Sequence, residues 1–321
     1  MTLDLEFDED DAALASSVKR FCADRCSPEV VAAGSGLQPA ERWPTDLWPN
    51  DLWRGFADLG VLALATPEGG GGATSIVAAM EQLGQANAPG PFVATFAAGQ
   101  LVHDADRKAI GAGEVIVSMG EPPLMPWLPV AGIVIELAGD TGYLARVDGP
   151  VEAVDTLGGE PWGRGHLVRI EEVAPVGPAL DLANTALAAY LAGAGQRLLE
   201  ATSQYAADRV QFRTAIGTFQ AVAHPLADSA LRLSAARSLA RVAAYAIDRH
   251  DANATAKAAA ARISASRAAL DISYRAHQFF GALGFTVEGP IAGVSSRIRQ
   301  LSMLAPRPAA NRDAVLAAHG L

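Results

Sequence analysis

One stretch of the chain, residues 205–228, combines a cation with a tight turn. It places Arg209 at the end of a predicted helix, continues through Phe212 and a glycine-containing turn, and restarts a helix at Gln220. A guanidinium group offers several fixed hydrogen-bond donors to a phosphate. This pattern therefore suits the binding of an anion.

A second stretch, residues 277–290, has the same character. It ends a predicted helix at Gln278 and follows it with Gly281 and Gly284. Glycines allow main-chain amides to approach an anion closely. An arginine from the first stretch and exposed amides from the second would together suit a pyrophosphate.

Other catalytic patterns are weak. The six histidines have neither H-x-x-x-H nor H-E-x-x-H spacing, and no serine lies in a G-x-S-x-G turn. The only two cysteines, Cys22 and Cys26, stand one helical turn apart, too few for a disulfide scaffold or a zinc site. We interpret them as reduced thiols and disfavour hydrolase and metalloenzyme functions.

Periodicity along the chain predicts a mostly α-helical protein with a small central β-domain. Helical spacing runs to about residue 109, short Val- and Ile-rich segments fill residues 110–176, and helical spacing returns over residues 177–321. The expected strands are residues 115–120, 132–138, 142–147 and 166–173. Three long amphipathic helices, with the segment after Pro290 as a fourth, predict a C-terminal four-helix bundle. In the third helix, Ile263 and Leu270 are expected on the inner face.

The composition of the chain restricts the kinds of molecule that it is expected to bind. The chain has 321 residues, is 50% hydrophobic and 19% charged, and carries a formal net charge of −10. Such a chain can bury a large core, and its negative charge argues against nucleic acid. No apolar run reaches the ~18 residues of a membrane span, and the acidic start is unlike a signal peptide. We expect a soluble, cytoplasmic protein.

Four motifs, in order, resemble the acyl-CoA dehydrogenase family over nearly the whole chain. Residues 209–228 are similar to the family's R-x-x-F-G turn and F-Q-A-x-x-H-x-L-A-D, and residues 278–285 to its Q-x-x-G-G-x-G-F/Y. Residues 59–72 and 81–91 are similar to L-G-x-x-x-x-x-x-P-E-x-x-G-G and E-x-L-G-x-x-x-A-P-x-P. The resemblance implies the family's order of helical domain, β-domain and helix bundle. It also implies FAD as cofactor, an acyl-CoA substrate oxidised to its 2,3-enoyl form, and an electron-transfer acceptor.

The carboxylate that removes the α-proton in this family has no counterpart here. Most members carry it about 21 residues beyond the last motif glycine, which here is Ala305, and residues 303–307 contain no acid. Other members carry it 26 residues before the arginine, which here is Ala183. Without that carboxylate, general-base catalysis typically falls by ~10²–10⁴-fold.

The loops that would contact the flavin ring and thioester of the same subunit also depart from the family. Its T/S-E-P-x-x-G-S-D loop resembles only residues 119–123, with Gly120 in place of the hydroxyl residue, and its E-G-T loop is absent. Arg213 replaces the usual glycine after Phe212, so the turn is expected to be altered.

These losses follow a pattern that the resemblance explains. The arginine and glutamine motifs of the family reach across a dimer to the pyrophosphate and adenosine of the neighbour's FAD, whereas the lost loops serve the same subunit. The chain therefore resembles the shorter, non-catalytic subunit of an α2β2 acyl-CoA dehydrogenase of the type associated with actinobacterial steroid catabolism, and a larger subunit would supply the base.

Three alternatives stay open at this point. The chain could be a homomeric dehydrogenase with a relocated base, for which Glu288 is the candidate. It could be a flavin-free structural or ligand-binding protein on the same fold. Flavin oxidases and monooxygenases share the fold as well, and fold alone does not settle chemistry.

Overall fold

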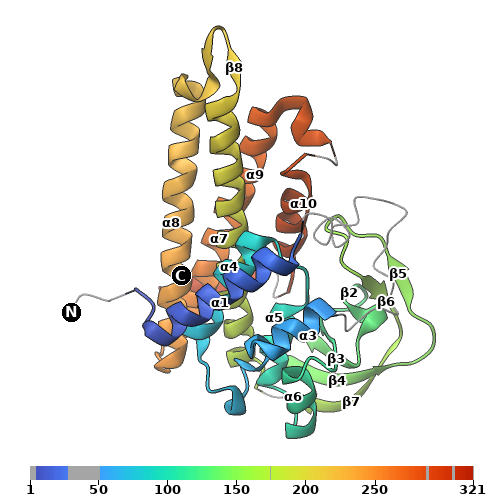
Figure 1. The fold of residues 1–321 in the computed structure, drawn as a ribbon. Coiled ribbons are helices and arrows are strands. Elements are labelled where there is room, and N and C mark those ends of the chain that lie inside the picture. The colour runs from blue at the N-terminus through green and yellow to red at the C-terminus, as the bar shows by residue number, and fades with distance from the viewer. Residues whose placement is uncertain (1–4, 28–50, 174, 287–288, 306–307, 321) are drawn as a thin grey trace.

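The structure, a computed structural model, describes residues 5–27, 51–173, 175–286, 289–305 and 308–320. Its N-terminal part is helical, as the periodicity predicts (Figure 1). The helices here are α1 (Glu9–Arg25), α3 (Asp51–Asp58), α4 (Ala73–Ala86), α5 (Phe92–Gly99) and α6 (Asp104–Gly111). The carboxylate of Asp8 caps α1 by accepting a hydrogen bond from the Asp11 amide at 2.8 Å. Asp8 thereby satisfies one of the free amides at the start of that helix.

The four expected strands are all present and form one sheet in the order β1-β3-β4-β7. They are β1 (Val117–Gly120), β3 (Ile133–Ala138), β4 (Thr141–Val147) and β7 (Leu167–Val173). β1 pairs with β3 in parallel, and the other pairs are antiparallel. A second sheet in the order β2-β6-β5, which the sequence does not predict, is built from β2 (Met125–Pro126), β6 (Trp162–Arg164) and β5 (Glu152–Val154).

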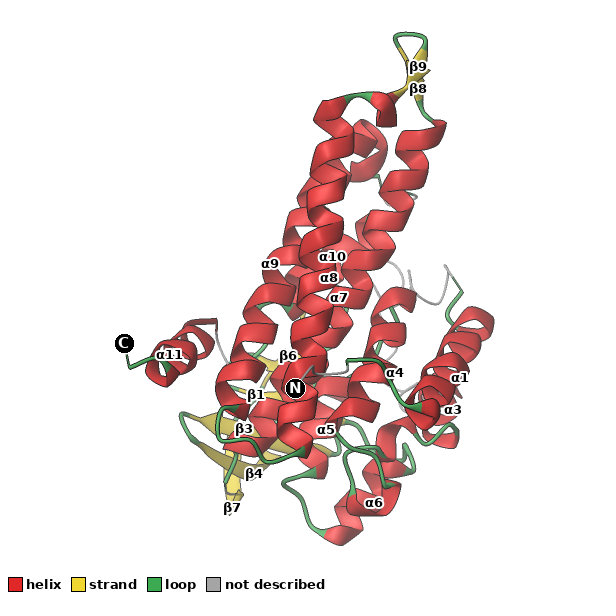
Figure 2. Ribbon diagram, turned by 90° about the vertical axis from the view of Figure 1, so that its left-hand side faces the viewer, coloured by secondary structure: helices red, strands yellow, loops and turns green. Residues whose placement is uncertain are grey.

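Long helices dominate the C-terminal part and project beyond the sheets (Figure 2). They are α7 (Gly177–Asp208), α8 (Gln220–Asp248) and α9 (Ala254–Phe280), followed by α10 (Ala292–Leu301) and α11 (Pro308–Ala318). The fourth bundle position after Pro290 is filled by α10, which has only ten residues and packs on α7 and α9. In α9 the expected inner face is wrong in detail: Ile263 and Leu270 are half-buried, while alanines and Ile272 form the buried face.

Glycines allow α4 and α7 to cross at very short range. A Cβ added to Gly84 would stand 2.0 Å from the Tyr190 carbonyl oxygen, and one added to Gly193 would stand 2.2 Å from that of Glu81. Both neighbours are backbone atoms of rigid helices, which cannot move aside. This contact fixes the N-terminal helices against the bundle.

Two features are absent from the described residues. No helix among them combines the length and the apolar character needed to cross a membrane. No group of three or more His, Cys, Asp or Glu side chains among them is arranged to hold a metal ion.

Candidate functional site

The predicted anion-binding residues gather at one end of the bundle, which we call the bundle tip and define as residues 205–220 and 277–285 (Figure 1). Here α7 ends, α8 begins and α9 ends. Tyr205 of α7 stacks on Phe280 of α9 with ring centroids 4.3 Å apart, which joins the two segments. Five of the six predicted residues are exposed, namely Arg209, Phe212, Gln220, Gln278 and Gly281, whereas Gly284 is buried.

A β-hairpin with a two-residue turn forms part of the bundle tip. Strands β8 (Val210–Gln211) and β9 (Thr214–Ala215) pair antiparallel around Phe212 and Arg213, whose φ angles are 52° and 71°. Positive φ at both central residues is the geometry of a type I′ turn, which favours Asn-Gly. Arg213 takes the left-handed conformation at the second central position, so the turn forms although glycine is absent there. The turn holds Phe212 88% exposed, edge-on to Phe219 with centroids 6.3 Å apart.

The bundle tip carries uncommitted hydrogen-bond donors. Within the described part of the chain, Arg209 has no ion pair and the Gln278 amide has no hydrogen bond. The Nδ1 atom of His277, one residue before Gln278, is buried without a hydrogen-bond partner. Gly281 has a φ of +60°, and nothing lies within 4 Å of the position its Cβ would take. A guanidinium, an amide and an open glycine turn are a donor set that fits a pyrophosphate.

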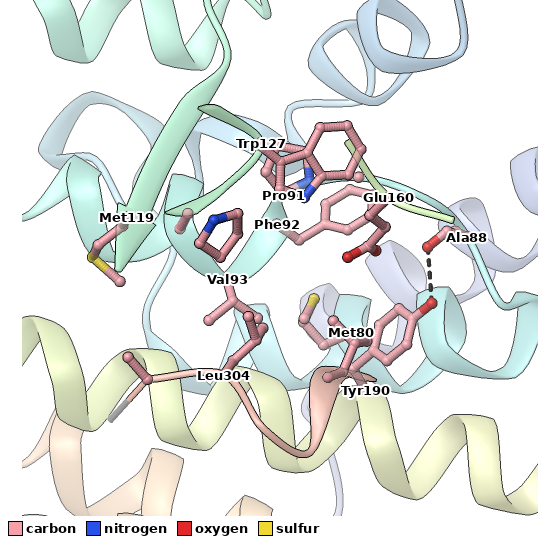
Figure 3. Close-up of a pocket in the computed structure, with 15 residues that line it drawn as sticks. Met80, Ala88, Pro91, Phe92, Val93, Met119, Trp127, Glu160, Tyr190 and Leu304 are labelled. Atoms are coloured by element: carbon pink, nitrogen blue, oxygen red, sulfur yellow. Dashed lines mark hydrogen bonds between the residues drawn. The ribbon is translucent and has the colours of Figure 1, made fainter. Parts of the chain in front are cut away.

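The two positions where the family places its base meet at the other end of α7. Ala183 is 1% exposed and belongs to an apolar cluster with Met119 of β1, against which Ala305 packs. Ala305 and Met119 also line a pocket together with Phe92, Trp127 and other side chains (Figure 3). The structure thus brings together three segments that the resemblance assigns to one site.

This pocket is nearly filled. Phe92, Trp127, Tyr190 and Leu304 crowd its interior, and the space left has a volume of about 40 Å³. Small-molecule sites usually measure ~300–1,000 Å³. The remaining space admits a few water molecules, so in this conformation the pocket does not fit an isoalloxazine ring beside an acyl chain.

One acid, Glu160, lies in the pocket wall and was not predicted from the sequence. It is 4% exposed, its Oε2 accepts a hydrogen bond from Gln300 at 3.1 Å, and its Oε1 lies 3.6 Å from Nε of Arg297, which is 1% exposed. Burial raises the pKa of the Glu160 carboxyl, although the Arg297 charge opposes the rise. Figure 3 shows this carboxylate enclosed by Phe92, Trp127 and Tyr190.

Among the described residues that line the pocket, Tyr190 is the other ionisable one. Its hydroxyl donates a hydrogen bond to the Ala88 carbonyl oxygen at 2.8 Å, and burial raises its pKa to about 12. It is therefore neutral at physiological pH. The fallback base from the sequence, Glu288, lies outside the described residues.

Comparisons with known proteins place both halves of the chain in one family. Residues 8–106 match the acyl-CoA dehydrogenase N-terminal domain and residues 177–305 match the acyl-CoA dehydrogenase C-terminal domain. Over 243 residues the chain is 32% identical to "Acyl-CoA dehydrogenase IpdE2" of Mycobacterium tuberculosis, an alignment that covers 72% of this chain and 74% of the relative.

Solved structures share the fold over almost the full length. The ChsE4-ChsE5 complex from Mycobacterium tuberculosis gives a TM-score of 0.83 at 20% identity, covering 99% of both chains. The Tcur3481-Tcur3483 steroid ACAD G363A variant gives 0.80 at 22% identity, covering 97% of this chain and 98% of the other. At these identities the likeness concerns the fold. From the two matched domains and the relative aligned over 72% of this chain, the chain belongs to the acyl-CoA dehydrogenase family of FAD-dependent enzymes.

Proposed function

We propose that this chain is the non-catalytic subunit of a heteromeric acyl-CoA dehydrogenase. The observation that carries the proposal is the contrast along α7. At one end, alanines occupy both family base positions beside a nearly filled pocket. At the other end, the bundle tip offers the exposed side chains of Arg209 and Gln278, which make no ion pair or hydrogen bond among the described residues. A larger subunit then supplies the base, the ring pocket and the thioester site.

The bundle tip is the part of this chain that serves the shared reaction. FAD, when bound, supplies the hydride acceptor for dehydrogenation of a CoA thioester between Cα and Cβ. Arg209 and Gln278 would hold its pyrophosphate and neighbouring polar groups, and the open turn at Gly281 would let backbone amides approach. Gln220 stands at the start of α8, where the amides of a first helical turn lack internal partners. These residues bind and orient the cofactor, and they transfer no proton.

Phe212 gives the bundle tip an apolar contact. An aromatic side chain that is 88% exposed on a strained turn gains stability when another surface covers it. We infer that the partner subunit covers Phe212 when the complex forms. The hairpin thereby places Arg209, which directly precedes β8, against the partner's cofactor.

Glu160 does not replace the missing base in this proposal. A general base must reach a substrate proton and must exchange that proton with bound substrate. The Glu160 carboxylate instead faces Gln300 and Arg297 inside a wall that leaves about 40 Å³ of space. The alternative function that this buried acid would support is a homomeric dehydrogenase in which Glu160 is the base.

The names of similar proteins support a steroid-derived thioester as substrate. One structural neighbour is titled a steroid ACAD, and another is a complex of two differently named chains. We propose a bulky, ring-bearing acyl group for the complex that contains this chain, and an electron-transfer acceptor that reoxidises the flavin.

The test is the flavin content of this chain alone and with its partner. We expect the chain purified alone to be colourless, and its co-expression with a full-length acyl-CoA dehydrogenase homologue as the larger subunit to give a yellow complex that forms enoyl-CoA. Neutralising the partner's catalytic carboxylate should abolish turnover with FAD still bound. A homodimer of this chain that holds one FAD per subunit and forms enoyl-CoA would overturn the proposal.

A further inference from the structure

The last turn of α1 holds both cysteines of the chain. The Cys26 amide donates to the Cys22 carbonyl oxygen at 2.9 Å, so the two residues lie one turn apart on the same face of the helix. The two thiols lie close enough for each to shift the pKa of the other. Cys22 is 3% exposed, whereas Cys26 is only partly buried. Cys26 therefore keeps some solvent exposure, whereas Cys22 is shielded from solvent.

Two arginines make the surroundings of Cys26 electropositive. Arg197 of α7 and Arg297 of α10 act on its thiol through their charges, and both are anchored to the end of α4. Arg197 donates to the Gln85 carbonyl oxygen at 3.1 Å, and Arg297 donates to that of Asn87. These bonds fix the guanidinium groups in place.

The two thiols differ in acidity as well as exposure. The hydrogen bond from Cys22 is the largest influence that lowers the pKa of Cys26, and the charges of Arg297 and Arg197 add to it against burial. The pKa of Cys22 is raised, because its thiol donates to Cys26 and is buried. A partly exposed thiol of lowered pKa beside a second thiol is the arrangement found in redox-sensitive cysteines.

We propose that Cys26 and Cys22 form a peroxide-sensitive dithiol, a modification site in which Cys26 is oxidised first and Cys22 converts the product into an intrachain disulfide. This inference does not depend on the proposed function. The oxidant is a peroxide from solution.

The chemistry balances in two steps. The Cys26 thiolate attacks one oxygen of hydrogen peroxide, the O–O bond breaks, and sulfenic acid forms as hydroxide leaves and takes up a proton to become water. The Cys22 sulfur then attacks the Cys26 sulfur, forming the S–S bond as the sulfenic hydroxyl leaves with the Cys22 proton as a second water. In sum, two thiols lose two electrons to one peroxide.

The position at the end of the helix allows the disulfide to close. Cβ atoms four residues apart in a helix are ~5–6 Å apart, whereas a disulfide requires ~3.5–4.5 Å. Cys26 must therefore move by ~1–2 Å. It is the C-cap of α1, with a ψ of 61°, so its movement breaks no helical turn that follows it.

The experiment treats the full-length chain with hydrogen peroxide and follows both thiols by mass spectrometry. Because the chain has only two cysteines, we expect both thiols to disappear together, with a mass lower by two hydrogens, and to return with dithiothreitol. In Cys22→Ala, Cys26 should stop at a sulfenic acid that dimedone traps. In Cys26→Ala, Cys22 should stay reduced at the same dose.

A charge variant separates this site from general thiol reactivity. Arg197→Gln should slow the oxidation of Cys26 several-fold, while Arg146→Gln, which removes an exposed arginine of β4, should leave the rate unchanged. Equal reactivity of the two cysteines, disulfides between chains, or direct formation of sulfinic acid in the wild type would each overturn the proposal. The wild-type measurement alone can refute it if either cysteine variant fails to fold.

Discussion

Replacing Arg209 with alanine should weaken FAD binding by the proposed heteromeric complex without unfolding this chain. The side chain is exposed and, among the described residues, takes part in no ion pair. Its backbone amide still donates to the Tyr205 carbonyl oxygen at 2.9 Å after the substitution. The fold of the bundle tip therefore loses no contact that the structure assigns to the guanidinium.

The size of the effect follows from the kind of bond that is removed. A hydrogen bond to a charged group contributes ~1.5–3 kcal/mol. Since ~1.4 kcal/mol is a tenfold change in affinity, the Kd for FAD should rise by ~10- to 150-fold. Gln278→Ala removes a neutral donor to an uncharged polar group of the cofactor next to the pyrophosphate, and such a bond contributes ~0.5–1.5 kcal/mol, so the Kd should rise by only ~2- to 12-fold.

The assay is fluorescence titration of the apo-complex with FAD, backed by cofactor retention on gel filtration. Arg146→Ala is the matched control, because Arg146 is also an exposed arginine but lies on β4, away from the bundle tip (Figure 1). An Arg209→Ala complex that binds FAD as tightly as the wild type would show that the arginine motif survives only for packing. A comparable loss in Arg146→Ala would show that net charge is responsible.

Three further predictions concern other parts of the molecule. Because burial raises the pKa of Glu160, the folded state keeps that proton to higher pH than the unfolded chain, so the unfolding free energy of the wild type should fall relative to Glu160→Gln as pH rises above 4.5. Turnover of the Glu160→Gln complex should stay unchanged, and loss of turnover with FAD bound would favour a homomeric enzyme. Arg213→Gly should relieve ~1–2 kcal/mol of left-handed strain and slow hydrogen exchange in the β8–β9 hairpin, and faster exchange would contradict this. In urea unfolding, Gly84→Ala should destabilise the chain by at least ~1–3 kcal/mol, whereas Gly177→Ala, which meets open space, should change stability by less than ~0.5 kcal/mol, and equal effects would refute the crossing argument.

Sequence patterns predict the main sheet well because its strands are short segments rich in Val and Ile that Gly, Pro and Asp separate. The second sheet escapes prediction because its strands have only two or three residues and contain Trp162, Gly163 and Pro126, which show no period. The inner face of α9 is misassigned for a different reason. Alanine occurs all around that helix, so the larger Ile263 and Leu270 suggest an inner face that is displaced from the fully buried one.

The candidate site also contains some residues that the sequence predicts and others that it does not. The bundle-tip residues are found from sequence because an arginine, a glutamine and glycines at fixed spacings form a local motif. Glu160 carries no such signal, since it lies in a Gly- and Pro-containing loop and meets Gln300 and Arg297 only through tertiary folding. The filling of the pocket likewise depends on Trp127, which takes a φ of 62° that no pattern in the sequence indicates.

The length of α7 explains how one function could be lost while the other is kept. Ala183 and Arg209 are 26 residues apart on one helix, which at ~1.5 Å per residue is ~40 Å. One dinucleotide cofactor cannot bridge that span, so the two ends of α7 would serve two different cofactor molecules. Substitutions that fill the pocket near Ala183 therefore leave the donors at Arg209 untouched. A chain with this geometry can give up its own ring site and still complete the site of a partner.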